Sequence, residues 1–302
     1  MAGADRIINL TNSPASDDAS PPLFRTSMGN ILTAAQKARV GHVVILSDPV
    51  TPDVLEEEGG EGVAELDLED AVAPDAKPRA RRSVLAWLAQ GHRVWIRIND
   101  RRSGYWADDV GALASSHGLL GVVLPETESA ADVAETAALA GVGVVALIET
   151  ARGVENAGHI ARAAGVVALA LGSADLRLDA GLGDDPLAWA YPRSRLVFAA
   201  RAAGLKGPLD GPDMQLDDAL ITRVQAEQAR AAGFGGKLCI HPRQVSAVNE
   251  AFGYTREQAA WARAVVSAAE HSHGAAVRVG GEMIDSPRLE LAKRIVTAEQ
   301  EK

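Results

Sequence analysis

The feature that most constrains the fold is the repeated alternation of short apolar runs with longer amphipathic segments. Most of these runs are continuous rather than alternating in hydrophobicity, which is typical of parallel strands covered on both faces. Helical patterns separate many of them, at residues 77–90, 129–140, 153–164, 186–203 and 217–232. The apolar runs themselves fall at residues 42–46, 63–68, 93–98, 119–124, 142–149, 166–172, 205–210 and 236–241.

Eight strand-then-helix units predict an α/β fold, a closed (β/α)8 barrel, which needs about 250 residues and fits this chain of 302. The seventh run contains a proline and is the weakest of the strand predictions. A doubly wound open sheet is the structural alternative. We expect an N-terminal arm over residues 1–22, the barrel over 23–252, and a C-terminal helical extension over 253–302.

Two short patterns predict where helices begin. Ser129 followed by Asp132 has the spacing of a helix cap, and Thr255 followed by Gln258 has that of a capping box. A glycine-containing link then leads to a last helix that starts near Pro287. The extension is therefore predicted to consist mainly of helices.

Charge and cysteine content exclude several kinds of partner. The net charge of −10 disfavours broad attraction to nucleic acid or to an anionic membrane. Cys239 is the only cysteine, so neither an internal disulfide nor a cysteine-based zinc site can form. The apolar runs are too short to span a bilayer, and no signal-peptide pattern opens the sequence. A cytoplasmic protein without nucleic-acid or membrane partners is predicted.

Polar residues follow the apolar runs at several places where strands are expected to end. In a (β/α)8 barrel these carboxyl ends meet at one open mouth, where reacting groups are found. Any single charged residue there is more often merely solvated, so only the set is informative. Its members are Glu69, Asp70, Arg97, Asn99, Glu149, Asp175, Asp210 and His241.

Two of these carboxylates predict a metal site. Glu149 and Asp175 belong to neighbouring strands, so both can reach one hard divalent cation, for which Mg²⁺ or Mn²⁺ is the expected choice. Arg97 can offer its planar fork to a substrate carboxylate from the opposite wall. A mouth of this kind would bind a small oxo or hydroxy acid against the metal.

The stretch ELDLEDAV, residues 65–72, places four acids among leucines. Its period-two spacing predicts that Glu65, Asp67 and Glu69 face the barrel axis while the leucines lie under the helices. Buried carboxylates are costly unless they are compensated. A divalent cation with its waters, and Arg97 nearby, are the compensation we expect.

Seven ordered motifs resemble the citrate lyase beta subunit and malyl-CoA lyase group of the HpcH/HpaI aldolase superfamily. The similarity extends from about residue 40 to 290 and is specific for the family rather than for a substrate. The motifs are LDLEDAV (66–72), K..AR (77–81), RIN (97–99), W.DD (106–109), LIET..G (147–153), LGSADL (171–176) and IHP (240–242).

The resemblance implies roles for individual residues. Mg²⁺ would be bound by Glu149 and Asp175, and Arg97 would hold the carboxylate of the oxo acid. An acid in a C-terminal G.MID.P segment, here Asp285, would act as acid/base in the mouth of a neighbouring subunit, so trimers or hexamers are implied. The implied roles are catalytic for Arg97, Asp70 and Asp285, substrate-binding for Arg97, Asn99 and Trp106, and supporting the metal's waters for Asp67 and Glu69.

The implied activity is Mg²⁺-dependent cleavage or formation of a carbon-carbon bond in a small hydroxy dicarboxylic unit, through an enolate, with the unit carried as an acyl-CoA. Two alternatives stay open. The stretch LSDPVTPDV near the first run lacks basic residues and Glu126 follows the fourth, which favours an aldolase for free hydroxy-oxo acids without CoA. The other alternative is a non-catalytic subunit that binds an oxo acid.

A Schiff-base aldolase would need a desolvated lysine in the mouth. Lys237 begins the last run and so faces the other end, and Lys77 is predicted to start a helix. Metal-based chemistry is therefore the prediction that we favour.

Overall fold

The computed structural model describes residues 64–91, 93–114, 116–215, 218–240, 242–271 and 277–300. The chain divides into two compact units, Met1–Asn249 and Glu250–Lys302. The predicted N-terminal arm, the predicted strand at 42–46 and the LSDPVTPDV stretch lie outside the described residues, as does His241.

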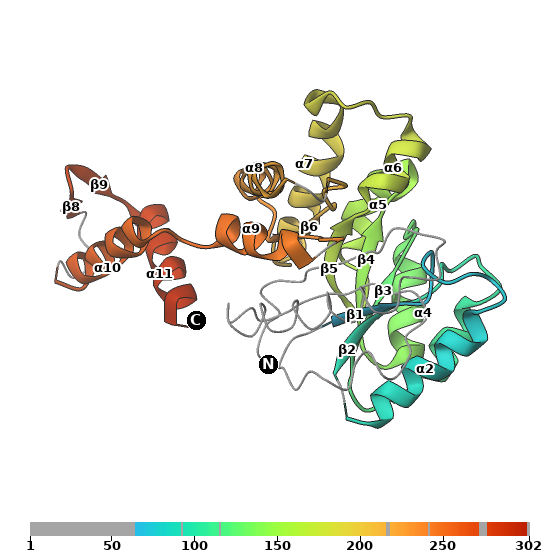
Figure 1. Cartoon of the computed structure of the whole chain (residues 1–302). Coiled ribbons are helices and arrows are strands. Elements are labelled where there is room, and N and C mark those ends of the chain that lie inside the picture. The colour runs from blue at the N-terminus through green and yellow to red at the C-terminus, as the bar shows by residue number, and fades with distance from the viewer. Residues whose placement is uncertain are drawn as a thin grey trace. The chain divides into compact units, whose positions relative to one another are not determined.

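The first unit is built on a sheet of seven described strands whose order in space is their order in the sequence (Figure 1). All neighbouring pairs are parallel. A curled parallel sheet of this order is that of a (β/α)8 barrel, so the predicted fold class is confirmed. The strands are β1 (Ala64–Asp67), β2 (Val94–Arg97), β3 (Leu119–Leu124), β4 (Gly143–Ile148), β5 (Val166–Leu171), β6 (Leu209–Asp210) and β7 (Gly236–Lys237).

Helices follow the strands along the chain. Three of them, α3, α6 and α9, were not predicted; α3 and α6 have only eight residues each, too few for a clear helical period. None of the described helices has the length and apolar content that a membrane span requires. The helices are α2 (Lys77–Ala89), α3 (Trp106–Leu113), α4 (Ala130–Ala140), α5 (Ala151–Ile160), α6 (Ser173–Ala180), α7 (Pro186–Ala202), α8 (Ala219–Ala232) and α9 (Pro242–Phe252).

Two apolar layers cover the two faces of the sheet. The inner layer contains Trp95, Val123, Val145, Leu147 and Leu209, which point into the barrel. The outer layer packs alternate strand residues against the helices, and α4, α5 and α7 lie along it (Figure 1). Because both faces are buried, the strands read as continuous apolar runs, as predicted.

The last two strands are much shorter than predicted. β6 begins only after Pro208, which has no N–H for the ladder, and β7 ends at Lys237. Asp210 pairs with Lys237, whose Nζ lies 3.1 Å from the Asp210 Oδ2, and with Arg193 of α7 at 3.0 Å. Leu209 points into the barrel, so Asp210 lies on the helix side of the sheet, and its predicted place at the mouth is wrong.

The second unit consists of helices α10 (Arg256–His271) and α11 (Ser286–Gln300) and an antiparallel hairpin of β8 (Val277–Val279) and β9 (Glu282–Ile284). The capping box is confirmed, since Thr255 and Gln258 exchange side-chain and backbone hydrogen bonds of 3.0 and 3.2 Å. The predicted glycine-containing link is partly this hairpin, with Gly280 and Gly281 at positive φ in its turn.

Candidate active site

Asp67 and Arg97 form a buried ion pair at the carboxyl ends of β1 and β2. The two residues are opposite each other in the strand register. The Arg97 Nε donates to the Asp67 Oδ1 at 2.9 Å, and Nη2 donates to Oδ2 at 2.6 Å. A fork-to-fork pair of this kind fixes both side chains in one plane.

The Asp67 carboxylate also organises the turn after β1. It accepts the backbone N–H groups of Glu69 at 2.8 Å and Ala71 at 3.0 Å. Burial alone would raise the pKa of Asp67, but the charge of Arg97 and these hydrogen bonds outweigh it and lower the pKa below its usual value. Asp67 is therefore an ionised anchor for the segment that carries Glu69 and Asp70.

Two further acids, Glu65 of β1 and Glu69 of the turn that follows it, have raised pKa values. Burial raises the pKa of Glu65 to about 8, and none of the described residues hydrogen-bonds to the Glu65 Oε1. Burial raises the pKa of Glu69 to about 8 as well. The charge of Arg97 opposes this rise, and repulsion by Asp70, Asp67 and Asp175 adds to it. The Arg97 Nη1 lies 2.8 Å from the Glu69 Oε2, so one guanidinium faces more acid than it can neutralise.

The period-two prediction for ELDLEDAV is confirmed in the strand itself. Glu65 and Asp67 are 1% and 3% exposed and lie next to Arg97, whereas Leu66 and Leu68 belong to the apolar layer under the helices. The acids therefore face inward, and the only described cation that pairs with them is Arg97.

Glu65→Gln is expected to change how stability depends on pH. Since the pKa of Glu65 is raised from 4.5 to about 8, the folded protein holds a proton that the unfolded chain releases in this window. The parent therefore loses stability as pH rises, and the glutamine variant does not. At about 1.4 kcal/mol for each pKa unit, the variant should gain about 3–4 kcal/mol relative to the parent between about pH 5 and about pH 8. Urea unfolding at a series of pH values measures this difference.

The exposed Glu227→Gln on α8 is the matched control. Its unfolding free energy should differ from that of the parent by a nearly constant amount across the same pH range. A constant difference for Glu65→Gln would contradict the buried, protonated state of Glu65.

Glu149 directly follows β4, and its carboxylate is 3% exposed. Its Oε1 accepts the backbone N–H of Glu126 at 2.6 Å, and Glu126 adopts a positive φ of 45° there. A Cβ at Gly172 would lie only 2.2 Å from Oε2, so glycine leaves the space in which Glu149 lies. Burial first, and then the charge of Glu69, raises the pKa of Glu149 well above its usual value.

Asp175 lies in the first turn of α6, one turn before Asp179. The Asp179 Oδ2 accepts the N–H of Ala151 at 2.6 Å, which ties α6 to the turn that follows Glu149. Asp175 is exposed, and its charge contributes to the raised pKa values of Glu69 and Glu149. The fold thus places the two predicted ligands within electrostatic reach of each other.

The donor chemistry of this site fits a hard divalent cation. Among the described residues the acids that crowd together here are Glu69, Glu149 and Asp175, and the cation that acts on Glu69 and Glu149 is Arg97. Within the described ranges, no three His, Cys, Asp or Glu side chains are arranged as a complete metal site. Two protein carboxylates that leave positions for water and substrate are the arrangement expected for Mg²⁺. Metal binding by Glu149 and Asp175 stays a prediction.

Three other predicted residues differ in their accessibility. Asp70 is exposed beside Glu69, and partial burial, with repulsion by Asp175 and Asp67, raises its pKa. Asn99 is 3% exposed. Trp106 is 5% exposed, belongs to the outer apolar layer, and donates its indole N–H to the Thr136 Oγ1 at 3.2 Å. Substrate contact stays a prediction for Asn99 and Trp106.

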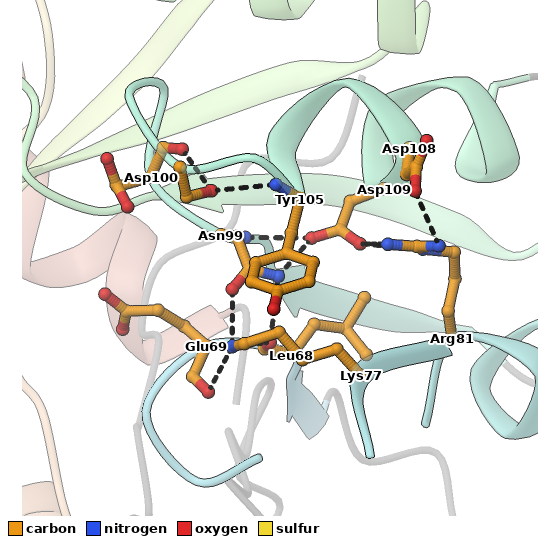
Figure 2. Close-up of polar contacts among 10 residues, drawn as sticks. Leu68, Glu69, Lys77, Arg81, Asn99, Asp100, Tyr105, Asp108 and Asp109 are labelled. Atoms are coloured by element: carbon orange, nitrogen blue, oxygen red, sulfur yellow. Dashed lines mark hydrogen bonds and ion pairs between the residues drawn. The ribbon is translucent and has the colours of Figure 1, made fainter. Parts of the chain in front are cut away.

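A buried polar cluster lies beside Glu69, and of its members only Asn99 was predicted as a site residue (Figure 2). Lys77, Arg81, Asn99 and Asp109 are linked by hydrogen bonds below the turn that carries Glu69. The signal was present in the sequence as the motifs K..AR and W.DD, but apolar periodicity says nothing about which buried polar residues meet.

Asp285 belongs to the second unit and is exposed at the start of α11. Its Oδ1 accepts the N–H of Arg288 at 3.1 Å, so the carboxylate caps the helix. An acid/base role for Asp285 in a neighbouring subunit stays a prediction.

Comparison with known proteins identifies the family. Residues 63–242 match the family model described as HpcH/HpaI aldolase/citrate lyase. A citrate lyase subunit beta-like protein of Deinococcus radiodurans is 36% identical over 254 residues, which cover 78% of this chain and 88% of that protein. An L-malyl-CoA/beta-methylmalyl-CoA lyase of Rhodobacter capsulatus is 29% identical over 306 residues, and the match covers 86% of this chain and 94% of that protein.

A solved structure supports the same relationship. The crystal structure of protein CitE from Mycobacterium tuberculosis, in complex with magnesium, acetoacetate and coenzyme A, has a TM-score of 0.70 and 33% identity, covering 83% of this chain and 95% of that one. The resemblance predicted from the motifs, and with it the assignment to a group of lyases, is confirmed. The chain belongs to the HpcH/HpaI aldolase/citrate lyase family.

Proposed function

We propose that this chain is a Mg²⁺-dependent carbon-carbon lyase that cleaves or forms a small hydroxy dicarboxylic unit carried as a CoA thioester. The observation that carries the proposal is the group of Glu149, Asp175 and Arg97 at the carboxyl ends of the strands. The names of the relatives, and the magnesium and coenzyme A in the similar crystal structure, support it.

Glu149 and Asp175 would hold the cation. Glu149 is pre-positioned by the Glu126 N–H and by the space at Gly172, so it needs little reorganisation to bind. Bound there, Mg²⁺ supplies Lewis-acid stabilisation of the negative charge that develops on substrate oxygens. The remaining work falls to side chains of the protein.

Arg97 would bind the carboxylate of the oxo acid. An arginine has five N–H donors, of which Arg97 uses two for hydrogen bonds to Asp67, and its Nη1 also forms an ion pair with the Glu69 Oε2. No hydrogen bond of the remaining donors is found among the described residues, so they can serve a ligand carboxylate while Asp67 keeps the guanidinium plane fixed. This rigidity favours recognition of one carboxylate orientation.

Cleavage would break the bond between the carbinol carbon and the carbon next to the thioester. Its electron pair would pass to the carbon next to the thioester carbonyl, which becomes part of an enolate, the hydroxyl would give its proton to the Asp70 carboxylate, and the carbinol would become the carbonyl of the oxo acid. Asp285 from a neighbouring subunit would then protonate the enolate carbon, with Asp70 as a further acid at the mouth. This assignment requires an oligomer, for which we propose a trimer or hexamer.

One observation favours a second candidate, an aldolase for free hydroxy-oxo acids. The backbone of Glu126 contacts Glu149, so its side chain lies near the rim of the site, where it pairs with Arg102 together with Glu128. These acids consume the positive charge that a CoA phosphate would need.

A lyase screen on the full chain tests both candidates. Malyl-CoA, citramalyl-CoA and free hydroxy-oxo acids are incubated with Mg²⁺ or with EDTA, and the oxo acid and acetyl-CoA released are quantified. We expect thioester cleavage that EDTA lowers at least about 100-fold, because the charge-stabilising cation is removed. Turnover of free acids alone would support the second candidate. Binding of oxaloacetate and Mg²⁺ without cleavage would instead identify a non-catalytic subunit.

A further inference from the structure

Lys77, the first residue of α2, directs its side chain into the protein beneath the turn that follows β1 (Figure 2). It is 8% exposed. Its Nζ donates to the carbonyl oxygens of Leu68 and Glu69, both at 3.0 Å, and to the Asn99 Oδ1 at 2.5 Å. An ammonium group has three N–H donors, so these three acceptors satisfy it completely.

The ring of Tyr105 covers the same ammonium, with its centroid 5.3 Å from Nζ. A buried cation that is hydrogen-bonded on three sides and covered by an aromatic face on another is held in one place. This geometry suits an anchor rather than a nucleophile, because no position around Nζ is left for a substrate carbonyl.

The acceptor on Asn99 is itself oriented by other groups. The Asn99 Nδ2 donates to the Leu68 carbonyl at 3.0 Å and to the Asp109 Oδ2 at 2.5 Å, and the backbone N–H of Asn99 donates to the same Oδ2 at 3.0 Å. Arg81 donates from Nε to the Asp109 Oδ1 at 2.8 Å. With Nδ2 committed to two acceptors, Oδ1 must face Lys77.

Two charged side chains thus hold the turn from opposite sides. Asp67 accepts the N–H groups of Glu69 and Ala71, while Lys77 donates to the carbonyls of Leu68 and Glu69. We propose that Lys77, held by Asn99 and Asp109, is a positioning residue that fixes the Glu69 and Asp70 carboxylates at the mouth of the barrel. The inference rests on the proposed function, since these carboxylates are taken to support the bound metal.

Hydrogen exchange of the backbone amides tests the positioning directly and needs no ligand. Lys77→Met keeps the length of the side chain but removes all three donors. We expect the amides of residues 68–72 to exchange at least about tenfold faster in this variant, because the turn is opened more often. Unchanged exchange would overturn the proposal.

Lys237→Met is the matched control. Lys237 is also buried, with Nζ 3.1 Å from the Asp210 Oδ2 and 2.6 Å from the Gly211 carbonyl oxygen, on the helix side of the sheet. Its loss removes the same charge and should leave exchange at residues 68–72 unchanged. Equal acceleration in both variants would show a general loss of stability and would also overturn the proposal.

Titration of the same proteins with Mg²⁺ and oxaloacetate links the positioning to the site. Lys77→Met should weaken binding by about 10- to 100-fold, the range typical for groups that orient metal-site residues. When Asp70→Asn is already present, Lys77→Met should weaken binding by a smaller factor, because one of the two carboxylates that Lys77 positions has been removed. If Lys77→Met weakened binding by the same factor with and without Asp70→Asn, Lys77 would not act by positioning the turn.

Asp109→Asn provides a second variant if Lys77→Met fails to fold. It retains the volume but removes the charge that orients Asn99, so it should give smaller changes of the same kind in exchange and titration. A parent protein that binds neither Mg²⁺ nor oxaloacetate would refute the proposed function, while the exchange measurement would still decide the role of Lys77.

Discussion

Gly172→Ala is expected to lower the affinity of the protein for Mg²⁺ at least about 100-fold. The new Cβ would lie 2.2 Å from the Glu149 Oε2 and 2.5 Å from its Cβ, so the carboxylate must move by about 1 Å or more. Displacement of that size at a reacting group is enough for a 100-fold loss. The backbone is not the cause, since φ of −87° and ψ of 90° suit alanine as well. Isothermal titration with Mg²⁺, in the presence of oxaloacetate, measures the effect.

Two comparisons make this result specific. Glu149→Gln removes the charge without steric change and should match Gly172→Ala in lost affinity, and the double variant should lose little more than either alone. Gly183→Ala is the control, because nothing lies within 4 Å of the added Cβ. Unchanged Mg²⁺ affinity in Gly172→Ala would show that Glu149 is not held as proposed.

The role of Gly172 shows what sequence can and cannot predict at this site. Glu149 and Asp175 were predicted because they follow two neighbouring apolar runs, a relation that the barrel fold converts into proximity. The space at Gly172 depends on the approach of two strands in three dimensions, and a glycine after a strand has many other uses. Only the close approach of Gly172 to Glu149 in the structure shows which of these uses applies here.

The strands and helices of the fold were likewise predicted only in part. Long continuous runs predicted β3, β4 and β5 to within about two residues at each end. β6 was predicted four residues too long at its start, where Pro208 cannot donate to the ladder, and β7 four residues too long at its end, where the apolar side chains continue past the ladder. Helix α6 was missed, since most of its side chains are exposed and Leu176 is its one buried residue. Burial pattern is the signal that sequence reading uses, and α6 has very little of it.

Arg97 was predicted to face Glu149 and Asp175 from the opposite wall and to lie near the acids of ELDLEDAV, and it pairs with two of those acids. The register that places Asp67 beside Arg97 is a property of the strand pair and is not written in either strand alone. These ion pairs are the compensation that was expected of Arg97, so Arg97 has this task in addition to the substrate contact that we propose. Both tasks can be tested with one set of variants.

Arg97→Met is expected to destabilise the protein by about 3–5 kcal/mol near neutral pH. It leaves the buried carboxylate of Asp67 without its partner, and loss of one member of a buried pair typically costs this much. In the parent the pKa of Asp67 is lowered, so its stabilising contribution is present above about pH 4 and is lost at lower pH. In the variant burial is no longer opposed by Arg97 but only by the backbone hydrogen bonds from Glu69 and Ala71, so that pKa rises and protonation relieves the cost in mild acid. The difference in unfolding free energy should therefore shrink from about pH 8 to about pH 5.

Two further variants distinguish the effect of the Arg97 charge from that of its planar guanidinium group. Arg97→Lys retains the charge but not the fork, so it should recover part of the stability while oxaloacetate affinity stays at least about tenfold reduced. Adding Asp67→Asn to Arg97→Met removes the unpaired charge and should recover stability without recovering binding. If Arg97→Met were as stable as the parent at pH 8 and still bound oxaloacetate, neither task of Arg97 would stand, because the acids of β1 would then have another source of compensation.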